Sequence, residues 1–479
     1  MSIGIADHSV ILRAIHPTGM MRGPDTGNKK ENQEVFNKPV NPNYCAVVVE
    51  LKSFTELANC DNVKAALIYG NSVIVSKGAK AGDIGLFFPV ETQLSKEFLH
   101  HNNLNRKAEL NCDQTKKGYF EEHGRIKAVK FRGHKSEGFF IPLDSIMFTG
   151  ITGADFASIK PGMEFDNVAG FTICRKYVPQ FNRRTSGSSR QQARKVSLED
   201  SIVDGQFAFH YDTAKLDRNL DKFQPHTIIS ITEKLHGTSA VFGNLLTKRD
   251  LSWWEKILKN LGVKIQETKY DYVWSSRRVI KGVGEPKENA AHYYDSDVWT
   301  DTFNKIKHLI PEGYTIYGEI VGYTKEGSAI QKGYHYGCPE KQHKLYVYRI
   351  TVTNDRGIVV ELSWPQVAEF CERTGLSTVP ILYYGFAWDL LEPLDGHIPE
   401  GSLQDWFLAT VKETYVDNRM CKYHGGNVPA EGVVVRIDGL RQSEAYKCKN
   451  FAFLEMESKL LDSGVADIET EESDAIPEN

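Results

Sequence analysis

Short apolar segments separated by turn-forming residues dominate the chain between residues 45 and 143. Two of them flank Gly70-Asn71, a two-residue hairpin signal, and two others flank a turn at residues 133–137. Several short strands joined by tight turns predict a small β-barrel. The segments are Ala46–Leu51, Ala65–Tyr69, Ser72–Ser76, Ile84–Val90, Arg125–Phe131 and Gly138–Leu143.

The second half of the chain mixes apolar strands with amphipathic helices. Apolar residues recur at helical spacing from Leu251 to Leu261, which predicts a helix that packs on the domain. A substrate clamp is the alternative interpretation of this insertion. A capping box at residues 363–366 begins another helix that Gly375 ends, and a third helix is predicted from Leu403 to Tyr415. Strands are predicted at 227–232, 315–321, 345–350 and 433–435.

The length and charge of the chain indicate how many domains to expect and where its charges lie. A chain of 479 residues is too long for one ordinary core, so two domains with linkers are expected. The formal net charge of the chain is −4. The segment after Leu461 contains seven acidic residues and no lysine or arginine, so residues 1–461 carry a net charge of −4 + 7 = +3. Residues 182–195 carry five positive charges and no negative one. This segment predicts a polar linker, either a solvated hinge or a strap that contacts phosphates.

The eight cysteines include no Cys-x-x-Cys pair, which argues against a zinc ribbon and against a disulfide framework. The N-terminus has no signal-peptide pattern, and no apolar run approaches about 18 residues. These features predict a soluble, cytoplasmic protein that does not bind a membrane.

Candidate chemistry centres on Glu233-Lys234-Leu235-His236-Gly237-Thr238-Ser239, which directly follows a β-rich run. A strand that ends at Lys234 fixes its amine, and Gly237 allows a phosphate to approach the backbone closely. A surface lysine entering a turn is the alternative, because Lys-x-x-Gly alone is common.

Downstream segments favour the catalytic interpretation. Lys447 and Lys449 lie two residues apart, so on a strand both face one side, where they can lower the pKa of a nearby lysine. Glu431 precedes the β run 433–435 beside a glycine, a place where a carboxylate can hold a hydrated magnesium ion.

Taken in order, these segments resemble the motifs of ATP-dependent RNA ligases of the covalent nucleotidyltransferase superfamily. Lys234–Ser239 resembles the nucleophile motif Lys-x-His-Gly-x-Ser/Asn of that family. The other matches are Ser276-Arg277, Tyr317–Ile320, Leu345–Ile350, Glu431–Arg436 and Tyr446–Lys449. The resemblance covers roughly residues 226–460, and the N-terminal block, which ends near Tyr177-Val178-Pro179, resembles that of RNA ligase family five.

The resemblance implies a role for each site residue. It makes Lys234 the residue that takes AMP, places Lys447 and Lys449 on the α-phosphate, and gives Glu431 the metal ion. The nucleotide-binding residues that it implies are Glu233 (adenine amino edge), His236 and Gly237 (nucleotide pocket), Arg277 (ribose or adjacent phosphate, with Arg278 as a substitute), Glu319 (ribose hydroxyls) and Tyr348 (adenine stacking). Tyr346 is expected in the core, and Arg349 stands where relatives often carry an acid.

The predicted fold class is α+β. An N-terminal OB-like β-barrel precedes a nucleotidyltransferase (ATP-grasp-like ligase) domain of antiparallel sheets with flanking helices, and adenylate is expected between the sheets. The predicted parts are a nucleic-acid-binding domain (1–180), a basic polar linker (181–222), an adenylation domain (223–460) and a disordered acidic tail (461–479).

The predicted function is ATP-dependent RNA ligation of 3′-hydroxyl and 5′-phosphate ends, at nicks in duplexes, as in RNA repair. The reaction uses lysyl-AMP and an adenylated 5′ end, with ATP and Mg²⁺ or Mn²⁺. The expected partner is RNA or an RNA-containing nicked duplex, and the protein is expected to be a monomer. The alternatives are an ATP-dependent DNA ligase, a tRNA-repair ligase, and a nucleic-acid-binding protein with an inactive nucleotidyltransferase fold. DNA ligases usually carry their OB domain after the catalytic domain, where this chain has little room.

Overall fold

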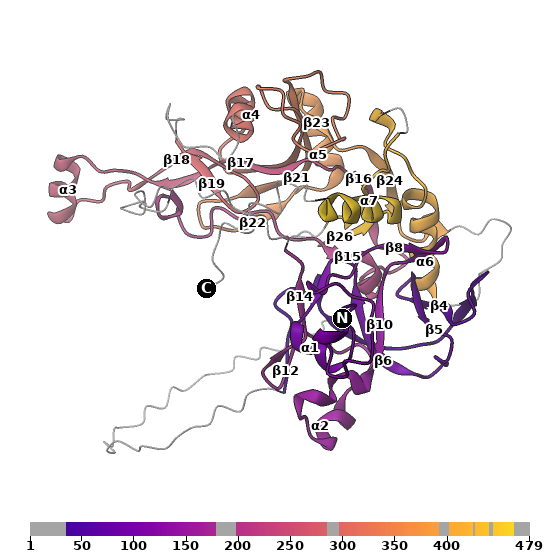
Figure 1. Cartoon of the computed structure of the whole chain (residues 1–479). Coiled ribbons are helices and arrows are strands. Elements are labelled where there is room, and N and C mark those ends of the chain that lie inside the picture. The colour runs from indigo at the N-terminus through magenta and orange to yellow at the C-terminus, as the bar shows by residue number, and fades with distance from the viewer. Residues whose placement is uncertain are drawn as a thin grey trace, which may run out of the picture. The chain divides into compact units, whose positions relative to one another are not determined.

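The structure is a computed structural model that describes residues 35–178, 198–284, 297–391, 402–424, 427–439 and 444–463 (Figure 1). The basic segment 182–195 and residues 464–479 of the expected acidic tail lie outside the described residues. The first residues of that tail, Leu461 and Asp462, belong to helix α7 (Phe451–Asp462). The helix therefore extends further than the acidic composition of the tail suggested. Among the described residues, no helix is long and apolar enough to cross a membrane.

Residues 35–178 form an N-terminal region of short strands around two apolar clusters. Its longest sheet has the order β10-β6-β2-β11, and β3-β4-β5 form a second sheet. The strands are β1 (Phe36–Asn37), β2 (Ala46–Glu50), β3 (Phe54–Glu56), β4 (Val63–Ile68), β5 (Asn71–Ser76), β6 (Ile84–Pro89), β7 (Thr92–Leu94), β8 (Val129–Phe131), β9 (His134–Ser136), β10 (Gly138–Pro142), β11 (Glu164–Phe165), β12 (Asn167–Val168), β13 (Phe171–Thr172) and β14 (Cys174–Lys176). Helices α1 (Lys96–His101) and α2 (Gly153–Ser158) lie outside these sheets.

The hydrogen-bonded strands of residues 35–178 form separate sheets of two to four strands and no closed barrel. The mixed class with antiparallel sheets is confirmed, whereas the OB-type barrel is not seen in the strand pairing. The first predicted hairpin exists, with its turn one residue earlier than expected, because Tyr69 and Gly70 both adopt positive φ (50° and 68°). The second predicted hairpin is wrong, since β8 pairs with β9 and β10 pairs with β6.

A seven-stranded sheet forms one side of the C-terminal part of the described chain, with the order β19-β18-β17-β20-β21-β22 and β23 paired to β21. Helices α4 and α5 pack on one face of it, where Trp299, Phe303 and Phe370 are buried against the strands. The predicted capping box of Ser363 and Gln366 begins α5, and Gly375 ends it at φ 73°. The elements are β17 (Thr238–Lys248), β18 (Thr268–Ser275), β19 (Ile280–Val283), α4 (Val298–Ile306), β20 (Tyr314–Gly322), β21 (His343–Thr353), β22 (Val359–Glu361), α5 (Trp364–Thr374) and β23 (Ser377–Thr378).

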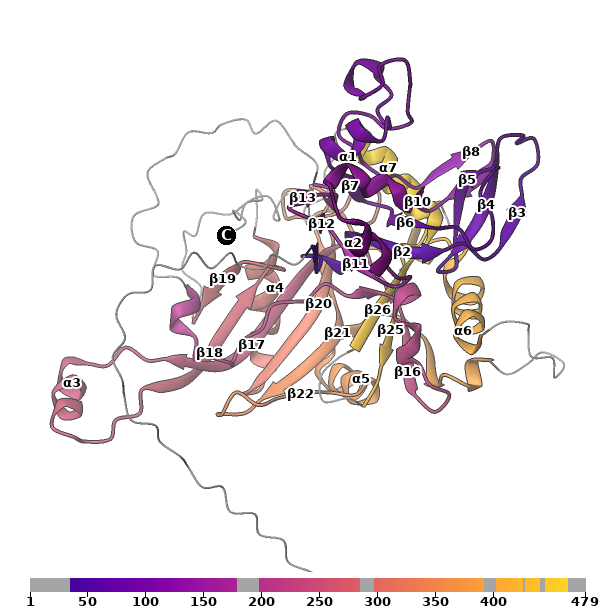
Figure 2. The same cartoon turned by 90° about the horizontal axis from the view of Figure 1, so that it is seen from below.

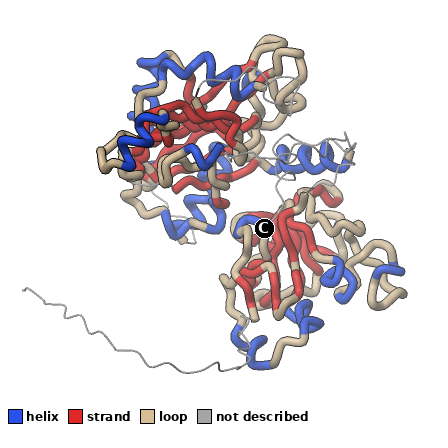
Figure 3. Tube along the Cα trace, turned by 90° about the vertical axis from the view of Figure 1, so that its left-hand side faces the viewer, coloured by secondary structure: helices blue, strands red, loops and turns tan. Residues whose placement is uncertain are grey.

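A five-stranded sheet forms the other side, with the order β15-β26-β25-β16-β24. Helix α6 covers its outer face through Phe407, Leu408 and Val411, so that the inner face is left for the site (Figure 2). Figure 3 shows the strands gathered inside, with helices and loops around them. The elements are β15 (Ala214–Lys215), β16 (Ile228–Lys234), β24 (Ile381–Phe386), α6 (Leu403–Val411), β25 (Gly432–Ile437) and β26 (Glu444–Lys449).

The insertion between β17 and β18 does not pack on the domain as predicted. Helix α3 (Trp253–Asn260) forms there and begins with a capping box of Ser252 and Glu255, but it buries none of its residues. Trp253 and Trp254 are each 60% exposed. Figures 1 and 2 show α3 at the far end of a long β17–β18 hairpin, beyond the reach of the core.

Candidate active site

Strand pairing explains how three distant segments meet at Lys234. In the pairing of β16 with β25, Lys234 stands opposite Gly432, and in the pairing of β25 with β26, Gly432 stands opposite Lys449. Lys447 lies two residues earlier on β26, opposite Val434. Residues that are far apart in sequence therefore lie side by side at one end of the five-stranded sheet.

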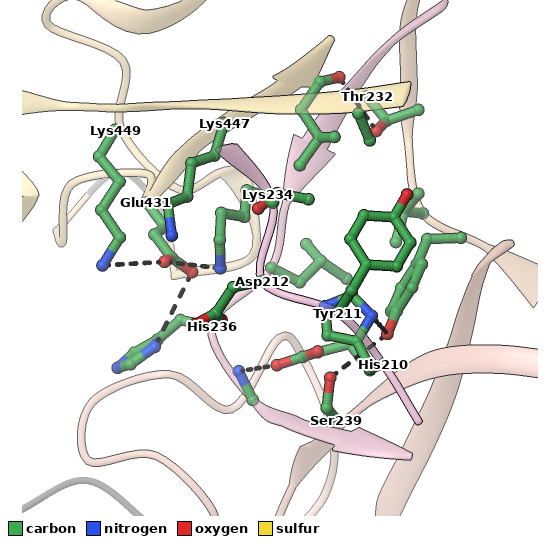
Figure 4. Close-up of a pocket in the computed structure, with 18 of the residues that line it drawn as sticks. His210, Tyr211, Asp212, Thr232, Lys234, His236, Ser239, Glu431, Lys447 and Lys449 are labelled. Carbon is green, nitrogen blue, oxygen red and sulfur yellow. Dashed lines mark hydrogen bonds and ion pairs between the residues drawn. The ribbon is translucent and has the colours of Figure 1, made fainter. Parts of the chain in front are cut away.

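Glu431, just before β25, is the centre of the charge cluster. Its Oε1 lies 2.8 Å from Lys234 Nζ and 3.4 Å from Lys449 Nζ, while its Oε2 lies 3.9 Å from His236 Nδ1 (Figure 4). The carboxylate is 2% exposed, and Oε2 has no hydrogen-bond donor among the described residues. A buried carboxylate oxygen of this kind is suited to a hard divalent cation, so Glu431 fits the predicted metal role.

The charges of this cluster lower the pKa of Glu431. Burial alone would raise the pKa of Glu431, but the charges of Lys234, Lys449 and His236 outweigh burial and hold the pKa below its ordinary value. Glu431 is therefore a carboxylate at neutral pH.

The two lysines of β26 differ. Burial lowers the pKa of Lys447 well below the ordinary lysine value, and the neighbouring Lys449 and Lys234 lower it further. Burial also acts to lower the pKa of Lys449, but Glu457 and Glu431 outweigh it, and this pKa is raised. Lys449 is therefore a fixed cation, and Lys447 is the lysine that loses its proton more readily.

Gly237 owes its place to strand packing. A Cβ at this position would lie 2.3 Å from the carbonyl oxygen of Ile320 and 2.8 Å from Val321 Cγ1. Its N–H donates a 2.9 Å hydrogen bond to Glu319 Oε1. The space that the sequence suggested for a phosphate is occupied by β20, and the glycine brings Glu319 close to the nucleophile motif.

A β-bulge places two consecutive residues of β21 at the pocket. Tyr317 pairs with Arg349 and Gly318 with Val347, so Tyr348 is the extra residue. Tyr348 and Arg349 both line the pocket, whereas Tyr346 is 6% exposed, belongs to the apolar cluster against which Tyr348 packs, and is not among the lining residues.

Glu233 precedes Lys234 in the sequence and His236 follows it, and different neighbours hold their side chains. Burial raises the pKa of Glu233, partly offset by Arg419, whose guanidinium lies 3.5 Å away. The N–H of His236 donates to the Tyr336 hydroxyl at 2.8 Å, and its ring meets those of Tyr334 and Phe453 edge-on. Both side chains are thus held in place by their neighbours.

The segment before β15 brings to the pocket residues that the sequence analysis missed. His210 Nδ1 lies 3.1 Å from the Tyr348 hydroxyl, which lies 3.3 Å from Ser239 Oγ, and Asp212 forms an ion pair with Arg277. Strand β15 holds this segment in place by pairing Lys215 with Lys447. The signal was present as an aromatic run, Phe207 to Tyr211, within a stretch assigned to a linker.

All ten predicted site residues line one pocket between the two sheets, whereas exposed Arg278 does not. The N-terminal region also contributes to the lining through Tyr44, Glu91, Lys176 and Tyr177. Lys176 and Lys215 each hold an ammonium 5.7 Å from the Tyr44 ring centre. The ten residues are Glu233, Lys234, His236, Gly237, Arg277, Glu319, Tyr348, Glu431, Lys447 and Lys449.

Comparison with known proteins agrees with this arrangement. Residues 227–449 match the family model described as RNA ligase. Three solved structures of Naegleria gruberi RNA ligase are similar in fold. A lysine mutant with AMP and Mn has 15% identity and a TM-score of 0.51, covering 86% of this chain and 98% of that one. A glutamate mutant with ATP and Mn has 15% identity and a TM-score of 0.52, covering 86% and 98%. A complex with PPi has 16% identity and a TM-score of 0.52, covering 88% and 100%. No curated protein matches the chain.

The pocket lies between two mainly antiparallel sheets and holds a cluster of lysines and a carboxylate. The family-model match over residues 227–449 agrees with the resemblance to RNA ligases that the motifs indicate, and the solved structures are similar in fold.

Proposed function

We propose that this protein is an ATP-dependent RNA ligase that joins a 3′-hydroxyl to a 5′-phosphate through lysyl-AMP on Lys234. The observation that carries the proposal is the position of Lys234 Nζ, 2.8 Å from Glu431 and at the junction of three paired strands. A fixed amine within a cluster of cations suits attack on a phosphate, where catalysis depends on positioning and charge.

In the first step, the neutral amine of Lys234 attacks the α-phosphorus of ATP. A P–N bond forms, the bond to the bridging oxygen breaks, and pyrophosphate leaves. Lys449, as a fixed cation, stabilises the charge on the phosphate oxygens, and Lys447 adds to this when protonated. In the resting site Glu431 holds the ammonium form of Lys234, so the amine must lose its proton before attack.

A divalent cation bound at Glu431 would neutralise the carboxylate and the phosphate charge together. Glu431 Oε2 is the oxygen available for it, which supports the proposed use of Mg²⁺. The similar Naegleria structures hold ATP or AMP with Mn, which supports ATP and either of these cations here.

The nucleoside is held by the seven-stranded sheet. Tyr348 offers a ring face for adenine, and its hydroxyl is fixed by His210 and Ser239. Glu319 and Arg277 are proposed to bind the ribose and the adjacent phosphate, and Glu233 the amino edge of adenine. Asp212 orients Arg277.

In the second step, AMP passes from Lys234 to the 5′-phosphate of the RNA, which forms a pyrophosphate linkage. In the third step, the 3′-hydroxyl attacks the 5′-phosphate and AMP leaves. The proposed substrate is an RNA-containing nicked duplex, as in RNA repair, bound by a monomer whose N-terminal region (1–180), OB-like in its short strands, contacts the nucleic acid. The basic linker within 181–222 and the net positive charge of the body support a polyanionic substrate.

Ribose is proposed to be required at the 3′-hydroxyl side of the nick, whereas DNA is tolerated on the 5′-phosphate side. A 2′-hydroxyl distinguishes RNA from DNA, and misplacement of the attacking group by about 1 Å can cost about 100-fold in rate. A DNA ligase or a tRNA-repair ligase of the same superfamily would show a different preference.

The test is a set of matched nicked duplexes with every combination of RNA and DNA at the two ends. The proposal predicts fast sealing only with ribose at the 3′-hydroxyl end, with AMP labelling of the enzyme the same for all substrates. Equal sealing of ribose and deoxyribose ends would contradict RNA specificity and favour the DNA ligase alternative. Lys234→Ala should take no AMP from ATP yet retain weak sealing of a pre-adenylated nick, whereas the exposed control Lys248→Ala should behave as wild type.

A further inference from the structure

Two adjacent histidines and a cysteine converge on the surface of the N-terminal region, away from the nucleotide pocket. Helix α1 ends at His101, and a loop returns the chain to Cys112 beside it. One donor atom from each of His100, His101 and Cys112 lies within 4.8 Å of the other two. We propose that these three side chains bind one Zn²⁺ ion, as a site separate from the magnesium site at Glu431.

Hydrogen bonds already fix the geometry of His100. The backbone N–H of Cys112 donates to the carbonyl oxygen of His100 at 3.0 Å, which holds the two residues side by side. His100 Nδ1 lies 2.9 Å from the carbonyl oxygen of Leu110. Because a carbonyl only accepts, Nδ1 carries the proton and Nε2 presents a lone pair. This is the arrangement in which zinc-binding histidines are usually held.

Ring packing holds the second histidine. The His101 ring stacks on Phe148 with 4.7 Å between centres and 11° between planes. The two histidine rings lie 5.1 Å apart at 81°. Neighbouring residues on a helix normally point apart, whereas here the two rings contact each other edge-on and each has a donor atom near that of Cys112.

The loop from residue 102 to 119 lacks an apolar core of its own. Its buried side chains are those of Asn105 and Asn111, and Asn111 Nδ2 donates to the carbonyl oxygens of Asn105 and Lys116. Because such a loop buries little apolar surface, a metal ion that joins it to a neighbouring helix would stabilise it, as metal ions stabilise small domains. The proposed ion would tie this loop to α1.

The donor set determines which metal fits. A thiolate and two imidazoles suit a borderline-soft ion such as Zn²⁺ and do not suit Mg²⁺. Zinc bonds of about 2.0–2.3 Å place tetrahedral ligands about 3.5 Å apart, so the exposed donors need to close by about 1 Å. Three protein ligands leave a fourth position for water. Among the eight cysteines, all of which the structure describes, Cys112 is the exposed one.

The decisive experiment is Co²⁺ titration of the full-length protein without nucleotide, followed by displacement with Zn²⁺. We expect one equivalent of Co²⁺ with a thiolate-to-cobalt charge-transfer band and tetrahedral visible bands, both removed by micromolar Zn²⁺. Cys112→Ser should lose the charge-transfer band, and His100→Gln should weaken Zn²⁺ binding at least 10-fold. Cys338→Ser and Glu431→Gln are controls that should keep the band, because neither touches the cluster.

Several results would overturn the proposal. They are the absence of the band, its persistence in Cys112→Ser, or Zn²⁺ binding only at millimolar concentrations. Trypsin cleavage in the loop, at Arg106, Lys107, Lys116 or Lys117, gives a second readout. Zn²⁺ should slow cleavage at least 10-fold in the wild type and not in Cys112→Ser, whereas equal protection of both proteins would contradict the role of the thiolate. AMP labelling of Lys234 should be unchanged in Cys112→Ser, so the zinc site and the ligase function succeed or fail separately.

Discussion

Strand β17 runs from the nucleotide pocket to a surface helix, and its two ends are stabilised in opposite ways. At its start, Ser239 lies opposite Glu319 and bonds the Tyr348 hydroxyl, among side chains that hold one another in place. At its end, helix α3 is stabilised by its own capping box and by the Arg249–Glu255 ion pair, and its tryptophans face outward. Convergent polar contacts fix the pocket, while α3 is a local element whose apolar face contributes no core. Changes at the two ends should therefore have very different effects.

The largest effect is expected from Glu431→Gln. The substitution keeps the shape of the side chain but removes the carboxylate charge that is proposed to hold the divalent cation, while Lys449 keeps Glu457 as a partner. Loss of the cation at the phosphate should lower AMP labelling about 100-fold to 1,000-fold, which corresponds to about 2.7–4.1 kcal/mol of transition-state stabilisation. The measurement is the rate of AMP transfer to the enzyme at saturating Mg²⁺. Glu457→Gln is the matched control, because that carboxylate contacts Lys449 but not Lys234, and it should lose much less. Near-normal labelling by Glu431→Gln would contradict the central position of Glu431.

A moderate effect is expected from Asp212→Ala, which releases Arg277. The KM for ATP should rise about 10-fold, in line with a charged contact of about 1.4 kcal/mol, while the kcat of labelling changes less. The double variant with Arg277→Ala should lose no more than Arg277→Ala alone, because one contact is removed in both. Asp204→Ala, an exposed carboxylate in the same segment, should match wild type. If the two substitutions raised the KM for ATP additively, Asp212 would not act through Arg277.

A smaller, pH-dependent effect is expected from Lys447. Since its pKa is lowered, its ammonium loses its proton at a pH below the ordinary lysine value of about 10.4, and its attraction for phosphate is then lost. The affinity of the enzyme for the Mg²⁺ complex of α,β-methylene-ATP, an analogue that cannot transfer AMP, should weaken several-fold as the pH rises through the lowered pKa of Lys447. Lys447→Arg stays charged and should show little weakening. Equal pH profiles for the two proteins would show that Lys447 does not titrate in the free enzyme.

The smallest effect is expected at the far end of β17. Trp253→Ala and Trp254→Ala remove side chains that are each 60% exposed and stack on one another outside the core, so AMP labelling should be unchanged and the melting temperature should move by less than about 2 °C. Trp299→Ala is the contrast, because this buried tryptophan of α4 should cost about 3–5 kcal/mol of unfolding free energy. A large loss of stability in Trp253→Ala would mean that α3 packs on the domain after all.

The sequence predicted which residues line the pocket better than it predicted how helix α3 and the N-terminal strands pack. Strand register brings Lys234, Glu431 and Lys449 together, and their motifs could be recognised because polar side chains at fixed spacing report directly on chemistry. The amphipathic pattern of α3 was recognised too, but such a pattern does not say which surface, if any, the helix covers. His210 and Asp212 were missed because their role depends on a parallel pairing of β15 with β26 that no local pattern encodes. The β8–β9 and β6–β10 pairings were missed for the same reason, as short strands fit several partners.

The central claim is that Lys234, and not another lysine of the cluster, takes the AMP. Lys447 is the chemically credible rival, since its lowered pKa favours its neutral amine. The most direct measurement is mass spectrometry of peptides from the full-length enzyme after incubation with ATP and Mg²⁺, prepared without acid because the P–N bond is labile there. The account predicts one adenylyl group, located on Lys234. An adenylyl group on Lys447 or Lys449, or no covalent AMP on the protein, would contradict it.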